Sequence, residues 1–130
     1  MPSIFSKIIA GEVPSHKVYE DDRFLAFMEL FPLKPGHTLV IPKTETDYIF
    51  DLDDKSLSDL TLTAKKVAVA IKKSVSCEKV AMLVYGLQVR HAHIHLVPVD
   101  GTAGELNFAN QKKASDTDLA TIATKIRSHL

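Results

Sequence analysis

His91-Ala92-His93-Ile94-His95-Leu96-Val97 is the most informative segment of this 130-residue sequence, because it holds three of the six histidines at alternate positions. Successive side chains of a strand point to opposite faces of a sheet. A strand here would therefore place three imidazoles on one face, and its alanine, isoleucine and leucine side chains on the other. We predict a strand with a core-facing side and a side that carries chemistry.

Three uses of such a histidine row compete. The first is a polar strand face with no special role. The second is a metal site, in which two neighbouring histidines and a third ligand such as His37 bind one ion; no cysteine pair or carboxylate lies nearby in sequence to complete the coordination. The third is phosphate chemistry, because a neutral imidazole is a nucleophile near pH 7 and its neighbours can balance charge or donate a proton. We favour the third, with His93 as the attacking group.

The sequence around this segment predicts a mainly antiparallel α+β domain. Hydrophobic spacing and turn residues predict strands at residues 17–20, 23–30, 37–41, 79–85 and 92–99, and helices at 4–10 and 116–129. A loop is predicted at residues 31–36, which contain two prolines and a glycine. Short links between the elements and the excess of strands over helices favour antiparallel pairing.

A long helix is predicted from an apolar stripe at 3.6-residue spacing, with a capping box at Ser56 and Asp59. The stripe consists of Leu57, Leu60, Ala64, Val67, Ala68, Ile71 and Val75. The last helix is predicted to start after a cap formed by Ser115 with Asp118. Its buried stripe would be Leu119, Ile122, Ala123, Ile126 and Leu130.

Composition narrows the possible partners. The chain has 16 Lys and Arg against 16 Asp and Glu, which removes the electrostatic footprint of a nucleic-acid-binding protein. Apolar runs are far shorter than the ~20 residues of a membrane span, so no membrane partner is expected. The single Cys77 excludes an internal disulfide and is typical of a reducing compartment. We expect a soluble cytoplasmic protein that acts on a small molecule.

The histidine segment matches the signature His-φ-His-φ-His-φ-φ, where φ is an apolar residue, and the chain thereby resembles the histidine triad (HIT) superfamily. Two further blocks are similar to its Hint-type branch: residues 4–14 with 17–21, and residues 35–43. The resemblance implies a HIT-like α+β fold with an antiparallel sheet of about five strands and flanking helices. It implies one HIT domain over residues 1–130.

The resemblance also implies an activity. Members of the family hydrolyse or transfer nucleotides at the α-phosphate, here of purine nucleoside 5′-phosphoramidates or related conjugates. By resemblance, His93 is the nucleophile and forms a nucleotidyl-histidine intermediate that water resolves. His91 and His95 would contact phosphate oxygens and assist the leaving group. His37 corresponds to a fourth histidine near the phosphate; the alternative for it is a loop-end histidine bonded to backbone.

A nucleotide pocket is implied by the same resemblance. Glu29 stands where the family has an aspartate that contacts the ribose hydroxyls, and Gln88 replaces a hydroxyl residue that contacts the phosphate. The alternative for Glu29 is a solvated surface residue. The base would contact a group of apolar residues that could equally be core: Ile4, Phe5, Ile8, Phe27 and Leu30.

The resemblance bears on metals and partners as well. Ser6 stands where some relatives have a cysteine of a structural zinc site, and the chain has no Cys-x-x-Cys, so we expect no metal and no cofactor. Members of the branch form homodimers, and we expect one here with a nucleotide as the small-molecule partner. Two alternative functions stay open: hydrolysis of dinucleoside polyphosphates, and a catalytically weak nucleotide-binding or scaffold protein.

Overall fold

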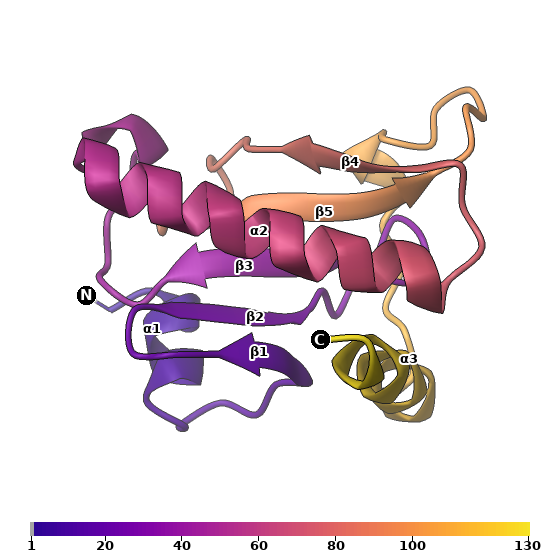
Figure 1. Cartoon of the computed structure of the whole chain (residues 1–130), viewed down its shortest axis with the longest axis horizontal. Helices are drawn as coiled ribbons and strands as arrows, with labels where there is room; N and C mark the ends of the chain where they lie inside the picture. Colours follow the sequence, from indigo (N-terminus) through magenta and orange to yellow (C-terminus); the bar gives the residue numbers. More distant parts are fainter. Residues whose placement is uncertain (1) are drawn as a thin grey trace.

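The computed structural model describes residues 2–130. Five strands form one antiparallel sheet in the spatial order β1-β2-β3-β5-β4 (Figure 1). The strands are Lys17–Glu20 (β1), Phe24–Met28 (β2), Thr38–Pro42 (β3), Lys79–Leu83 (β4) and Ile94–Val99 (β5). The helices are Ile4–Ile9 (α1), Asp54–Ser74 (α2) and Asp116–Ser128 (α3), with 3₁₀ turns at Ile49–Asp51 and Phe108–Asn110. The predicted α+β class, with one antiparallel sheet in a single domain, is confirmed.

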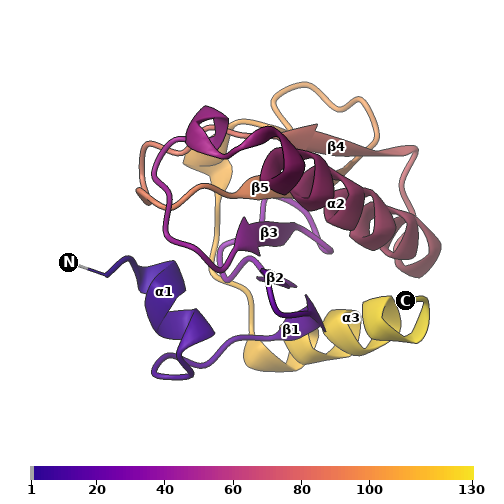
Figure 2. The ribbon, with the colours of Figure 1, turned by 60° about the vertical axis from the view of Figure 1, so that its left-hand side comes forward.

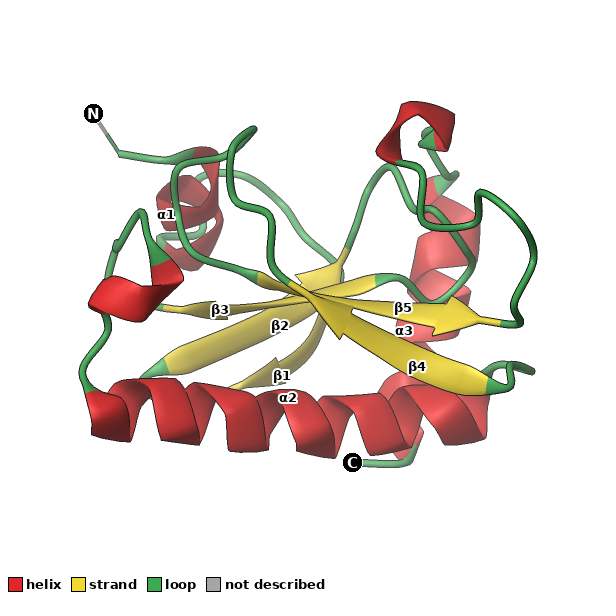
Figure 3. Ribbon diagram, turned by 90° about the horizontal axis from the view of Figure 1, so that it is seen from above, coloured by secondary structure: helices red, strands yellow, loops and turns green. Residues whose placement is uncertain are grey.

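The two faces of the sheet have different covers. Helix α2 runs along one face and α1 lies on the other (Figures 2 and 3). Ala26 and Met28 of β2 belong to the larger core, which is shared with α2 and α3. Leu25 and Phe27 alternate with them and pack in a smaller core with Phe5 of α1. The pleat of the strand thus separates a structural face from the face on which α1 lies.

The long helix begins earlier than predicted. Its N-cap is Asp53, whose carboxylate accepts a 2.7 Å hydrogen bond from the backbone N–H of Ser56. The predicted capping box is therefore wrong, because Asp59 lies on the outer face and pairs instead with Arg23 at 2.6 Å. The predicted apolar stripe is confirmed at its centre, where four residues are fully buried: Leu60, Ala64, Val67 and Ile71. Its other members, Leu57, Ala68 and Val75, are only partly buried.

The last helix starts as predicted. The Ser115 hydroxyl accepts a hydrogen bond from the backbone N–H of Asp118 at 3.1 Å. Leu119, Ala123 and Ile126 are buried against the sheet and α2, while Ile122 is partly buried. Leu130 lies beyond the helix and is 45% exposed, so its predicted burial is wrong. Among residues 2–130, no helix combines the length and the apolar character that crossing a bilayer requires.

Gly36 ends the loop that leads into β3, and its backbone requires glycine. Its φ is +99°, and a Cβ atom there would lie 3.1 Å from Pro98 Cγ and 3.2 Å from Val75 Cγ2. Both the conformation and the close approach exclude a side chain. Since Gly36 immediately precedes His37, the packing of this loop fixes the position of that histidine just before β3.

We expect Gly36→Ala to lower the free energy of unfolding by about 2–4 kcal/mol, from backbone strain plus the tight contacts. Gly101 is a matched control, because its φ is +91° but a Cβ there meets nothing within 4 Å. Gly101→Ala should therefore cost only the conformational part, about 1–2 kcal/mol. Urea unfolding of both variants measures the difference, and equal losses would show that the contacts with Pro98 and Val75 do not matter.

Candidate functional site

Four of the six histidines gather on the α1 face of the sheet. His95 lies in β5 opposite Leu39 of β3, and His37 is the residue before β3, so the antiparallel pairing brings these two rings together. His91 and His93 lie just before β5, which begins at Ile94 rather than at the predicted residue 92. All four are at most 5% exposed.

The alternation predicted for this segment is confirmed even though part of it precedes the strand. Ala92 and Ile94 belong to the core under α2. The rings of His91 and His93 lie on the other side and pack edge-on against the ring of Phe5, at centroid distances of 5.8 and 5.0 Å. The two sets of side chains therefore lie on opposite sides even though His91 lies in a bend and the strand begins only at Ile94.

The His93 ring is held in one tautomer by a backbone carbonyl. Its Nδ1 lies 2.7 Å from the carbonyl oxygen of His91. A carbonyl can only accept, so Nδ1 carries the hydrogen and Nε2 keeps a free lone pair. Burial lowers the pKa of His93 below its ordinary value, which favours the neutral ring at pH 7. His93 therefore presents an unprotonated nitrogen.

The His95 ring has the opposite tautomer. The backbone N–H of Leu33 donates to His37 Nδ1 at 3.0 Å, so the hydrogen of neutral His37 is on Nε2. That Nε2–H points at His95 Nδ1 at 3.0 Å, which leaves the His95 hydrogen on its own Nε2. Burial and the nearby histidines lower the pKa of His37 to about 4 and that of His95 to about 3, so both rings are neutral at pH 7.

A cavity of about 250 Å³ lies beside His93 and His95, whose ring centroids are 4.7 Å apart. Its wall includes every residue that we predicted to bind the nucleotide: Ile4, Phe5, Ile8, Phe27, Glu29, Leu30 and Gln88. Burial raises the pKa of the Glu29 carboxyl, which accepts a 3.3 Å hydrogen bond from the backbone N–H of Phe31. Apolar walls with a few polar groups are typical of a small-molecule site.

Two of the four histidines do not line this cavity. His37 is fully buried behind His95 and reaches the cavity only through that ring. His91 is fully buried behind Phe5, with Nε2 bonded to the Pro42 carbonyl and Nδ1 to the Ser3 hydroxyl, each at 2.8 Å. Of the three triad histidines, His93 and His95 therefore line the cavity, and His91 lies behind its wall.

Sequence reasoning missed part of the cavity wall. Phe108 packs edge-on against His95 at 5.0 Å, and Gln111 donates from Nε2 to the Phe31 carbonyl at 2.9 Å. Both come from the segment after β5, whose irregular structure gives no periodic pattern; the only signal is an aromatic residue in a polar stretch. The other lining residues not predicted are Phe31, Leu39, Tyr85, Gly86 and Val89.

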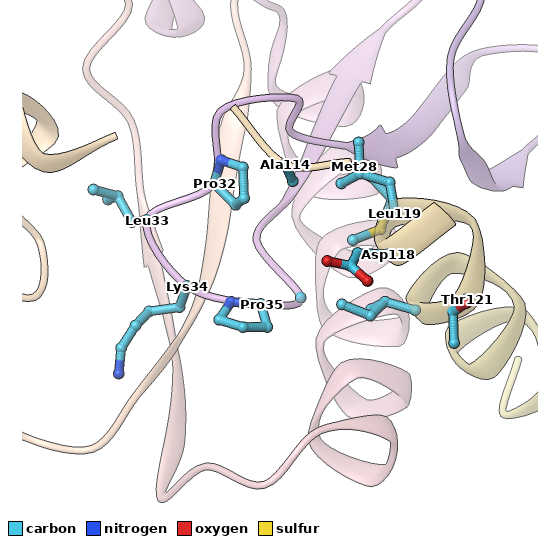
Figure 4. Close-up of a pocket in the computed structure, with 11 residues that line it drawn as sticks. Met28, Pro32, Leu33, Lys34, Pro35, Ala114, Asp118, Leu119 and Thr121 are labelled. Carbon is cyan, nitrogen blue, oxygen red and sulfur yellow. The ribbon is translucent and has the colours of Figure 1, made fainter. Parts of the chain in front are cut away.

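A second cavity of about 290 Å³ lies between the loop of residues 32–36 and α3 (Figure 4). Its wall includes Met28, Leu119 and Ile122, and none of the histidines reaches it. The two cavities lie on opposite sides of the sheet, since Met28 and Leu119 belong to the core under α2 and α3. The cavity beside His93 is therefore the candidate functional site.

Comparisons with known proteins place the chain in one family. The family model of the HIT domain matches residues 10–102. An uncharacterised HIT-like protein of Borreliella burgdorferi is 41% identical over 102 residues, which are 73% of either chain. Protein hit of Bacillus subtilis is 34% identical, over 98% of this chain and 93% of the relative.

Solved structures give the same result. A Hit-like protein of Bartonella henselae superposes with a TM-score of 0.86 at 34% identity, covering 98% of this chain and 96% of the other. A hypothetical histidine triad nucleotide-binding protein of Sulfolobus tokodaii gives 0.85 at 28% identity, covering 97% and 90%. The chain belongs to the HIT family, a superfamily of nucleotide-binding proteins and nucleotide hydrolases.

One structural neighbour, from Mycobacterium smegmatis, is a zinc-bound histidine triad protein with a TM-score of 0.81 at 26% identity, covering 97% of this chain and 91% of that one. The residues of the present chain do not fit such an ion at Ser6. The groups there are the hydroxyls of Ser3 and Ser6, the Glu45 carboxylate and His91 Nδ1. Only the last two are usual zinc ligands, and a structural zinc site needs four. Within residues 2–130, no three His, Cys, Asp or Glu side chains are arranged to hold a metal.

Proposed function

We propose that the chain hydrolyses purine nucleoside 5′-phosphoramidates, or related nucleotide conjugates, through a covalent intermediate on His93. The observation that carries the proposal is the pair of opposite tautomers at one cavity. His93 offers a bare nitrogen for attack, and His95, 4.7 Å away between ring centroids, offers an N–H. A nucleophile and a donor side by side are what substitution at phosphorus needs.

In the proposed reaction, His93 Nε2 attacks the α-phosphorus while the bond from phosphorus to the leaving amine breaks. The His95 N–H donates a hydrogen bond to the phosphoryl oxygen or to the departing nitrogen and stabilises the charge that develops there. The departing nitrogen takes up a proton from solvent and leaves as the amine. Water then attacks the nucleotidyl-histidine and frees the ring. Overall, one phosphorus–nitrogen bond and one O–H bond of water break, and a nucleoside monophosphate and a free amine form.

The cavity walls support the nucleotide assignment. Phe5 and Phe27 pack edge to face at 5.4 Å and offer aromatic surface to a base, with Ile4, Ile8 and Leu30 beside them. The half-buried Glu29 carboxylate would accept hydrogen bonds from ribose hydroxyls, which offset the burial of its charge. Gln88 lies at the exposed edge of the cavity, where its amide can donate to the phosphate.

We also propose a homodimer formed along β4, acting in the cytoplasm. Strand β4 is an edge of the sheet, so its outer backbone groups have no strand partner among residues 2–130. Met82 of β4 is 57% exposed, and α2 exposes Leu62 and Val69 one heptad apart. An apolar edge of this kind favours pairing with a second copy. The molar mass in solution tests it, and a monomer at micromolar concentration would contradict it.

The wild-type protein tests the proposed reaction directly. We expect it to turn over adenosine 5′-phosphoramidate faster than a diadenosine polyphosphate under the same conditions, measured as kcat/KM for each. A higher kcat/KM for the dinucleotide would favour the polyphosphate hydrolase instead. Binding of adenosine monophosphate without turnover of either substrate would favour a nucleotide-binding protein that lacks catalysis.

A further inference from the structure

A hydrogen-bonded cluster behind the cavity joins three segments that are far apart in the sequence. Ser3 and Ser6 come from the start of α1, Glu45 from the loop after β3, and His91 from the segment before β5. Glu45 Oε1 accepts from the backbone N–H of Ser3 at 2.6 Å and from the Ser6 hydroxyl at 2.7 Å. The Ser3 hydroxyl contacts His91 Nδ1 at 2.8 Å.

The direction of every hydrogen bond in this cluster follows from its ends. The Pro42 carbonyl can only accept, so the hydrogen of neutral His91 is on Nε2 and its Nδ1 is an acceptor. The Ser3 hydroxyl then donates to Nδ1 and accepts from the backbone N–H of Ser6 at 3.0 Å. The Ser6 hydroxyl donates to Glu45. One arrangement of hydrogens satisfies all the groups.

The cluster acts on the cavity through His91. The carbonyl of His91 accepts the hydrogen that fixes the tautomer of His93. The next residue, Ala92, donates from its backbone N–H to the Thr46 carbonyl at 2.6 Å, so the same loop that carries Glu45 also holds this segment. The Phe5 ring lies against both His91 and His93, so the cluster anchors α1 where it forms the cavity wall.

We propose that Ser3 and Glu45 are positioning residues for the reaction. Together with the Pro42 carbonyl, they hold the His91 ring in its Nε2–H tautomer and fix the position of its backbone. The His91 carbonyl then keeps His93 with its bare Nε2 toward the cavity, without a metal ion. The catalytic consequence rests on the proposed function, whereas the control of the tautomers does not. The hydrogen bonds from the Ser3 N–H and the Ser6 hydroxyl lower the pKa of Glu45 to about 2, so its carboxylate stays charged in acid as well as at neutral pH.

The test compares Ser3→Ala and Glu45→Ala with Ser3→Thr, which keeps the hydroxyl, and with Glu12→Ala as a control. Glu12 is an exposed glutamate outside the cluster and the cavity. Nitrogen-15 chemical shifts of the histidine rings report the tautomers in the free protein. We expect Ser3→Ala and Glu45→Ala to mix the His91 and His93 tautomers, because a His91 that has lost its anchor shifts and weakens its bonds to the Pro42 carbonyl and to His93 Nδ1. Ser3→Thr and Glu12→Ala should keep the wild-type spectrum.

Kinetics separate positioning from a merely structural role. We expect kcat for a nucleoside phosphoramidate to fall about 10- to 100-fold in Ser3→Ala and Glu45→Ala with KM nearly unchanged, because the reacting ring is misaligned while the walls remain. Fraying of α1 would instead raise KM, since α1 lines the cavity. Wild-type tautomers in both alanine variants would overturn the proposal, whether or not the wild-type protein turns over the substrate.

Discussion

Replacing His93 by alanine is expected to abolish turnover of adenosine 5′-phosphoramidate, with kcat lower by about 10⁴-fold or more. The reason is that His93 Nε2 is the unprotonated imidazole nitrogen that has no hydrogen bond, whereas His95 Nδ1 accepts from the His37 N–H. No other side chain there replaces it as a nucleophile: His95 presents an N–H, and His91 and His37 lie behind the wall. Steady-state kinetics on the purified variant measures the loss.

The same variant provides its own control. Phe5 of the base wall packs against the His93 ring, but Phe27 and His91 hold it as well, so adenosine monophosphate should still bind His93→Ala. Calorimetry on the wild-type and variant proteins measures this affinity. Turnover that survives in His93→Ala would contradict the assignment of the nucleophile, and loss of binding together with turnover would show that the ring serves mainly to hold the ligand.

Replacing His95 by phenylalanine is expected to lower kcat about 10²- to 10³-fold. Phenylalanine keeps the ring volume against Phe108 but removes the N–H that faces the cavity. We expect a larger loss for an alkylamine leaving group than for a weakly basic aromatic amine, because the poorer leaving group depends more on a hydrogen-bond donor. Rates for the two substrates, measured with both proteins, give this comparison.

Folding of the His95→Phe variant needs a separate check, because the His37 Nε2–H loses its acceptor and an unpaired buried donor costs about 1–3 kcal/mol. Thermal unfolding shows whether the variant is folded at the assay temperature. An equal loss of rate for both leaving groups would mean that His95 acts on the phosphoryl oxygens alone. An unchanged rate for both would contradict any role for its N–H.

Much of the fold could be predicted because the sequence pattern and the packing agree. The alternation at residues 91–97 separates Ala92 and Ile94 from the histidines, and both sets lie where the pleat of a strand would put them. The stripe of α2 and the Ser115 cap of α3 depend only on local spacing. These features need no knowledge of which strands are neighbours.

The features that sequence reasoning missed depend on contacts between distant segments. His91 is withdrawn from the cavity because Ser3 and the Pro42 carbonyl bond both of its nitrogens, and neither partner is near it in the chain. Phe108 and Gln111 reach the cavity through an irregular connection after β5. The N-cap of α2 is Asp53 rather than the predicted Ser56 for a simpler reason. Aspartate and serine are both good capping residues, and the hydrophobic spacing alone does not choose between them.

Mass spectrometry of the rapidly quenched reaction with adenosine 5′-phosphoramidate would detect the covalent intermediate. We predict a protein species heavier by one adenylyl group, with the modification on His93 and absent from the His93→Ala variant. Hydrolysis at full rate with no adduct at any quench time, or an adduct on another residue, would contradict it.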